Sequence, residues 1–179
     1  MIRALALLLL WVPLGVAQES ERPTVVSLDY CADQFVLGLA DPDQILGVSH
    51  GADKPHSHLR EKAADFRKIR STTEDVIALN PDLIINHWGA DAHALAMYER
   101  FGIKVHQIGF GSTLDAARNE TLSAAIALGQ PERGRAFIDA MYDGAPSSDQ
   151  AALYITPGGL TAGNETMVGD IMRLSLIHI

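Results

Sequence analysis

The chain lacks the residues that cross-linked, nucleic-acid-binding or common catalytic proteins need. It has a single cysteine in 179 residues, which excludes an internal disulfide. Its 14 Lys and Arg face 22 Asp and Glu, giving a formal net charge of −8. Nucleic acids and anionic membranes require clustered basic residues, so neither is an expected partner. The sequence also lacks the motifs G-x-S-x-G, H-E-x-x-H and G-x-x-x-x-G-K-[ST], so nothing in it points to an enzyme.

Long hydrophobic runs are scarce, and the first is too short to span a membrane comfortably. Arg3 precedes the apolar residues 4–12 and the small residues Gly15, Val16 and Ala17. This order predicts a secretory signal peptide, residues 1–17, cut after Ala17. The lone Cys31 lies far from that cut and cannot carry a lipid. We therefore expect a periplasmic chain without a membrane anchor, in which Cys31 is a small buried side chain rather than a reactive thiol.

Apolar runs with the spacing of strands alternate with runs that have the spacing of helices. Residues 25–28 predict a buried strand, and residues 32–40 predict a helix with Phe35, Val36 and Leu39 on one face. Further strands are predicted at 45–48, 83–85, 103–108 and 153–155, and further helices at 59–66, 71–79, 90–101, 113–128, 131–141 and 166–173. Such repeated units build a parallel sheet, so the fold class is α/β with a Rossmann-like lobe.

Two details of these helices are also predicted. Ser71 and Glu74 have the spacing of a capping box at the start of a helix. Leu95, Tyr98 and Phe101 recur at helical spacing and are expected to face inward.

A ligand site is expected where the parallel strands end. The loops there carry three aromatic residues, Tyr30, Trp88 and Phe110, together with His87 beside Trp88. Flat apolar area with a few polar contacts suits a bulky ligand, and an imidazole can ligate haem iron or donate a hydrogen bond. Packing of Trp88 within its own loop, or a purely structural His87, remains an alternative.

The segments VVSLDYCADQFVLGLADPDQILGVS, TTEDVIALNPDLII and ALYITPGGLTAGNETMVGDIMR resemble a known family. They are similar to the periplasmic substrate-binding proteins of ABC importers for iron–siderophores, haem and cobalamin, the Fe/B12 periplasmic-binding domain. The resemblance runs with gaps from about Pro23 to Arg173. The SL-x-x-CADQ opening paired with the later LYI-x-PGG-x-TAG segment carries most of it.

The resemblance implies two α/β lobes joined by a connecting helix. It divides the chain into an N-terminal lobe (18–130), a connecting helix and linker (131–150) and the start of a second lobe (151–173). It further implies a monomer that captures an iron chelate, haem or cobalamin and delivers it to an importer permease. The metal-bearing ligand is cargo, and no resident cofactor is expected.

Three residues receive roles from the resemblance. Glu74 matches a glutamate that docks an arginine of the permease. Gly158 and Gly159 lie in a loop that faces the ligand from the second lobe. Leu160 stands where relatives often have an aromatic residue.

Two other kinds of site remain open. His50, His56 and His58 suggest a zinc loop, although no spacing completes a metal site and a solvated loop explains them as well. A periplasmic metal-dependent hydrolase would use Asp29 with His50, His56, His58 or His87. A zinc- or manganese-binding importer component is a further alternative.

The last residues, 174–179, read LSLIHI after a helix start. They resemble the translation of a transposase end sequence, and we expect them to be non-native and the natural gene to continue past Arg173. A genuine apolar tail is the alternative.

Overall fold

The computed structural model describes residues 22–87, 91–141 and 153–174. The predicted signal peptide, Trp88, most of the predicted linker and the last five residues lie outside them. The strands are β1 (Val25–Ser27), β2 (Ile45–Ser49), β3 (Lys68–Ile69), β4 (Leu83–Asn86) and β5 (Lys104–Gln107). They form one sheet in the order β3-β2-β1-β4-β5, and every pair is parallel. This confirms the α/β prediction.

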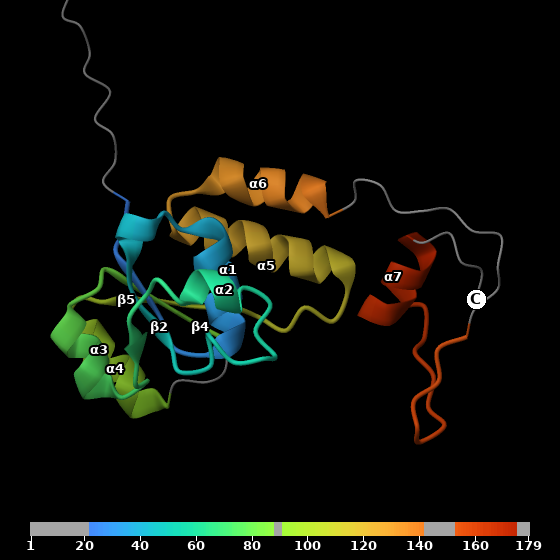
Figure 1. Ribbon diagram of the computed structural model, residues 1–179, viewed down its shortest axis with the longest axis horizontal. Coiled ribbons are helices and arrows are strands. Elements are labelled where there is room, and N and C mark those ends of the chain that lie inside the picture. Colours follow the sequence, from blue (N-terminus) through green and yellow to red (C-terminus); the bar gives the residue numbers. More distant parts are fainter. Residues whose placement is uncertain (1–21, 88–90, 142–152, 175–179) are drawn as a thin grey trace, which may run out of the picture.

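Helices cover both faces of the sheet (Figure 1). They are α1 (Tyr30–Leu39), the 3₁₀ helix η1 (Pro42–Gln44), α2 (Arg60–Ala63), α3 (Thr73–Leu79), α4 (Ala92–Arg100), α5 (Leu114–Ala127), α6 (Pro131–Ala140) and α7 (Met167–Leu174). Within the described residues, none of these helices has the length and apolar character needed to cross a membrane.

Alternation along the central strands explains the layers. Val25 of β1 packs with α1 and α5 in one hydrophobic cluster. Its neighbour Val26 points to the opposite face, where it packs with Val76 of α3 and Tyr98 of α4. Both valines are fully buried, as expected for strands covered on both sides.

A buried carboxylate joins β1, α1 and β2. Asp33 of α1 accepts hydrogen bonds from the hydroxyl of Ser27, from the Ser49 backbone N–H at 2.9 Å and from the Ser49 hydroxyl at 2.6 Å. All three residues are buried. Because each donor has this carboxylate as its acceptor, the group fixes the end of β2 against the first turns of α1.

The last described segment, residues 153–174, packs against the start of α5. The Leu114 N–H donates to the Asp170 carboxylate at 2.7 Å, and the Met167 N–H donates to the Ser112 carbonyl at 2.8 Å. The α5 N-terminus has unpaired N–H groups, so a carboxylate there is favourable.

Four sequence-based details differ from the structure. The edge strand β3 was not predicted. Thr72, not Ser71, caps α3, since its hydroxyl accepts from the Asp75 N–H at 3.3 Å, whereas the Ser71 hydroxyl donates to the Leu28 carbonyl at 2.5 Å. Glu74 is therefore not part of a capping box.

The predicted inward face of α4 is only partly right. Tyr98 is buried, but Leu95 and Phe101 are 39% and 54% exposed. The helix covers β5 at the edge of the sheet, so only a narrow stripe of it is buried.

The predicted strand at residues 153–155 is also wrong. Only an isolated antiparallel bridge joins Ile155 to Thr161, around a turn in which Gly159 has φ of 77°. Leu153 and Ile155 are 66% and 58% exposed. Within the described residues this segment pairs with no other strand, and an isolated strand pair is at best marginally stable.

The buried carboxylate gives a prediction with a defined sign. Burial raises the pKa of Asp33 above its usual 3.8, despite the hydrogen bonds from Ser27 and Ser49. The folded chain then holds the proton more tightly than the unfolded chain. The stability that this group contributes is therefore fully present below the unfolded pKa and is lost as the pH rises through the folded pKa.

We expect Asp33→Asn, which is uncharged at every pH, to lose this dependence. Urea unfolding of the parent and the variant between about pH 3.5 and 6 should show the parent losing stability relative to the variant as the pH rises. Asp33→Ala should lower the free energy of unfolding by about 1–3 kcal/mol, because two buried serine hydroxyls lose their acceptor. A parent-to-Asn difference that is constant with pH would contradict the assignment.

Candidate functional site

The sheet has a point where the strand order reverses. The chain leaves β1 toward β2 on one side and later returns to β4 on the other. In open parallel sheets, ligands bind outside the carboxyl ends of the strands at this point. The residues that follow β1 and β4, beginning with Leu28 and His87, are therefore where the candidate site is centred.

Asp29 holds these two strand ends together. One carboxylate oxygen, Oδ1, accepts from the backbone N–H groups of Cys31 at 3.0 Å and Ala32 at 2.9 Å and so caps α1. The other, Oδ2, accepts from the backbone N–H of His87 at 2.7 Å. A single side chain thus sets the spacing between the loop that carries Tyr30 and the loop that carries His87.

Tyr30 is the first residue of α1, and its side chain is 46% exposed. Its ring and the His56 ring form a T-shaped pair, with centroids 5.0 Å apart and an angle of 82° between the ring planes. A hydrogen bond with the Cys31 thiol raises the pKa of Tyr30 above its usual 10.0. The side chain is therefore a neutral phenol at physiological pH, available as a hydrogen-bond donor.

Cys31 itself is half-buried rather than fully buried, and burial raises the pKa of its thiol. The raised pKa disfavours the thiolate, which is the reactive form of cysteine. This agrees with the prediction that Cys31 is not a reactive thiol.

His87 and Phe110 form a second aromatic pair. Their rings are stacked, with centroids 6.3 Å apart and planes 23° apart. His87 Nδ1 lies 3.1 Å from the Ile108 carbonyl oxygen, which orients the imidazole. Phe110 is 75% exposed. An exposed phenylalanine held against a fixed imidazole offers apolar area to a ligand at little cost in ordering.

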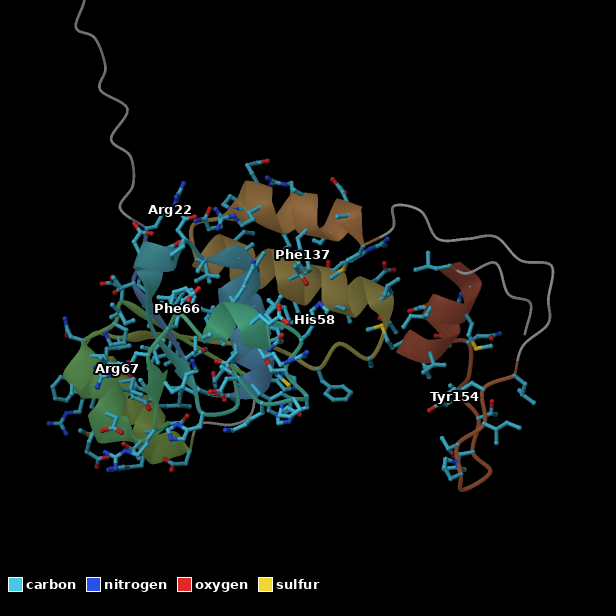
Figure 2. The ribbon with its side chains drawn as sticks, in the orientation of Figure 1. Arg22, His58, Phe66, Arg67, Phe137 and Tyr154 are labelled. Atoms are coloured by element: carbon cyan, nitrogen blue, oxygen red, sulfur yellow. The ribbon has the colours of Figure 1, made fainter. Side chains whose placement is uncertain are left out.

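The predicted glycine contacts lie on another part of the molecule. Gly158 and Gly159 belong to the exposed turn that precedes α7. Figure 2 shows Tyr154, on the same segment, well separated from His58, which lies on the loop after β2. The described residues do not bring this turn onto the rim of the sheet, and the role of both glycines stays a prediction.

Glu74 lies in the first turn of α3, and its side chain is exposed. The start of α3 is on the same side of the sheet as Tyr30, since Ser71 bonds to the carbonyl of Leu28. Glu74 is therefore available to a protein partner that approaches the rim.

Two surface hollows lie away from this rim. One of about 510 Å³ is formed by α1, α2 and α6 and includes Ile45, the first residue of β2. Another of about 570 Å³ lies between α4 and β5 and includes Lys104, the first residue of β5. Both are at the amino ends of the strands, and neither includes Tyr30, His56, His87 or Phe110.

A metal centre finds no support on this rim. Within residues 22–87, 91–141 and 153–174, no group of three or more His, Cys, Asp and Glu side chains is arranged to hold a metal ion. Asp29, the acid that the hydrolase alternative requires, instead uses both oxygens on backbone N–H groups.

Sequence reasoning did not foresee the Tyr30–His56 contact or the structural task of Asp29. An aspartate between a predicted strand and a predicted helix is typical of an N-cap, so the Asp29 contact with α1 could have been found. The contact with His87 joins residues 58 positions apart, and no local pattern indicates it.

Comparison with known proteins gives two kinds of similarity. No family model matches the chain. A curated cobalamin-binding protein of Halobacterium salinarum is 26% identical over 175 residues, covering 92% of this chain and 47% of the relative. The chain thus spans about half the length of the curated relatives that it matches.

Solved structures share the fold at lower identity. A possible iron-binding, periplasmic solute-binding protein of Staphylococcus epidermidis has a TM-score of 0.66 at 16% identity, covering 88% of this chain and 67% of that one. A periplasmic haem-binding protein of Roseiflexus sp. RS-1 has a TM-score of 0.55 at 21% identity, covering 88% and 65%. A periplasmic vitamin B12 binding protein of Vibrio cholerae has a TM-score of 0.52 at 18% identity, covering 87% and 65%.

The sequence is therefore similar to a curated cobalamin-binding protein, and the fold is that of the periplasmic binding proteins among the solved structures, which agrees with the resemblance that the motifs indicate.

Proposed function

We propose that the chain captures an iron chelate, haem or a cobalamin in the periplasm and delivers it to an inner-membrane ABC importer. The observation that carries the proposal is the pair of aromatic contacts, Tyr30–His56 and His87–Phe110, at the ends of β2, β1, β4 and β5. The relatives support it, since each is named for binding a ligand of this kind.

The arrangement favours binding over chemistry. The rim offers exposed rings, a neutral phenol and imidazoles, all of which suit the faces and polar edges of a large chelate. Asp29 and the Ile108 carbonyl hold the His87 loop before any ligand arrives. Little ordering is then required on binding, which leaves more of the contact energy as affinity.

Delivery to a permease rests on a different residue. Glu74 is exposed near the rim and is not engaged as a helix cap. A carboxylate in that position can form a charge-assisted hydrogen bond with an arginine of the partner. We infer that the permease approaches the face of the molecule where α3 begins.

The proposal is tested by titrating the full-length mature protein, including the expected second lobe, with haemin, cyanocobalamin, and ferric hydroxamate and ferric catecholate siderophores in a calorimeter. At least one ligand should bind, with a negative heat-capacity change because apolar area is buried. If none of them binds, the proposed function is wrong.

The aromatic rim predicts a specific loss. Phe110→Ala and Tyr30→Ala should each weaken binding of the selected ligand about tenfold, the loss expected for one exposed ring that packs on a ligand. The matched control is Phe101→Ala, because Phe101 is also exposed but lies at the end of α4, beside the amino end of β5. Equal losses in Phe101→Ala and Phe110→Ala would place the ligand elsewhere.

Glu74 predicts a separation of binding from delivery. Glu74→Arg should leave ligand affinity within about twofold of the parent, since an exposed substitution away from the rings costs little. Ligand uptake by cells that depend on this chain should fall strongly, because the reversed charge repels the partner arginine. Glu61→Arg on α2, also exposed, is the control. Normal uptake with Glu74→Arg would remove Glu74 from the docking surface.

A further inference from the structure

The loop after β2 carries three of the seven histidines of the chain, His50, His56 and His58. It begins at Ser49 and ends where α2 starts, at Arg60. The loop contributes to no metal site among the described residues. Its structure instead indicates a defined surface beside Tyr30.

Two adjacent residues of α1 fix the loop at both ends. Asp33 accepts from the N–H and hydroxyl of Ser49 at the start. Gln34 donates to the Ser57 hydroxyl at 2.9 Å and accepts from the Leu59 N–H at 3.0 Å at the end. The loop is thus tied to the same helix that presents Tyr30, so its side chains have a set relation to that residue.

The middle of the loop is packed as well. Ala52 and Ser57 are 0% and 1% exposed. A Cβ added to Gly51 would come within 2.8 Å of the Tyr30 Cβ, which shows how closely the loop backbone approaches Tyr30. The loop backbone is therefore anchored at these two residues, whereas residues 53–56 and His58 are exposed, as the alternative of a solvated loop predicts.

The three histidines have different surroundings. His50 Nδ1 lies 2.5 Å from the Ile69 carbonyl, so this ring is directed at β3. His58 is exposed near the start of α2. His56 is exposed and meets Tyr30 edge to face, which places an imidazole directly beside a neutral phenol on the rim.

The charge of the loop contrasts with that of the chain. Residues 49–60 contain Lys54 and Arg60 against the single acid Asp53, whereas the whole chain has a net charge of −8. Asp53 lies 3.4 Å from Lys54 and is thereby neutralised. Arg60 donates to the Ser57 carbonyl at 3.4 Å, so its charge stays with the loop. A local basic surface in an acidic protein attracts anionic groups.

We propose that this loop is a specificity-determining subsite in which His56, with Tyr30 beside it, binds an acidic group at the edge of the captured ligand. The inference rests on the proposed function and narrows it to anionic chelates, such as those with carboxylate or catecholate oxygens. The imidazole N–H and the phenol O–H donate to the anion, and the positive charge of Arg60 raises its local concentration.

The test compares ligands that differ in charge and little else. Haemin is set against its dimethyl ester, and a ferric catecholate against a neutral ferric hydroxamate. The parent should bind the anionic member of the pair that it accepts more tightly. His56→Phe keeps a ring against Tyr30 but removes the donor, and should reduce this preference roughly five- to tenfold, with little effect on the neutral member.

Two control variants make the result specific. His56→Gln keeps an N–H donor and should retain part of the preference. Arg100→Gln, which also removes a donor but lies at the exposed last residue of α4, beside the amino end of β5, should retain all of it. His56 is exposed, so its variants should fold, and thermal unfolding checks this.

The outcomes separate the two proposals. If the parent binds a ligand but shows no preference for the anionic member, or if His56→Phe keeps the full preference, the subsite is wrong and the capture function stands. If the parent binds none of these ligands, both proposals fail.

Discussion

The carboxylate of Asp29 is the constraint on which the rim depends. It accepts three backbone N–H groups, two from the first turn of α1 and one from His87 after β4. The negative charge lies at a helix N-terminus, where the exposed N–H groups and the helix dipole both stabilise it. Because the same side chain bridges the point where strand order reverses, the loops on the two sides of that point cannot separate without losing a charge-assisted hydrogen bond.

Much of the fold follows from local pattern, and the failures have physical causes. Buried strands such as β4 can be predicted from a continuous apolar run, here Leu83–Ile85, because both faces of the strand are covered. The strand β3 has only two residues, and only Ile69 of them is buried, so it leaves no periodic pattern. The predicted N-cap of α3 is wrong by one residue, because Ser71 and Thr72 are equally good caps. The hydrogen bond from the Ser71 hydroxyl to the Leu28 carbonyl leaves Thr72 as the cap.

The candidate site could be predicted in part from the sequence. Parallel strands end at one edge, so Tyr30 and Phe110 were expected together on a rim before any coordinates. Their actual partners were not expected. The contact of Tyr30 with His56 depends on the path of a ten-residue connection. That path is set by hydrogen bonds that Asp33 and Gln34 accept from Ser49 and Leu59, which are distant in the sequence.

At the amino ends of the strands, a different aspartate, Asp41, holds the chain together. There Asp41 binds Arg22, Arg133 and Gln130, and the bond with Arg133 holds the pKa of Asp41 below its usual value. These contacts join the start of the described chain, the end of α1 and the start of α6. Side-chain contacts therefore tie the chain together at the amino ends of the strands, as Asp29 and Asp33 do at the carboxyl ends.

The high exposure of Tyr30 and Phe110, 46% and 75%, has an evolutionary consequence. Side chains that bury little area on folding can be exchanged at small cost to the native state, whereas Asp29 and Asp33 beneath them cannot. Selection can thus exchange the surface rings, and with them the chemistry that the rim presents, while the hydrogen-bonded frame beneath stays intact.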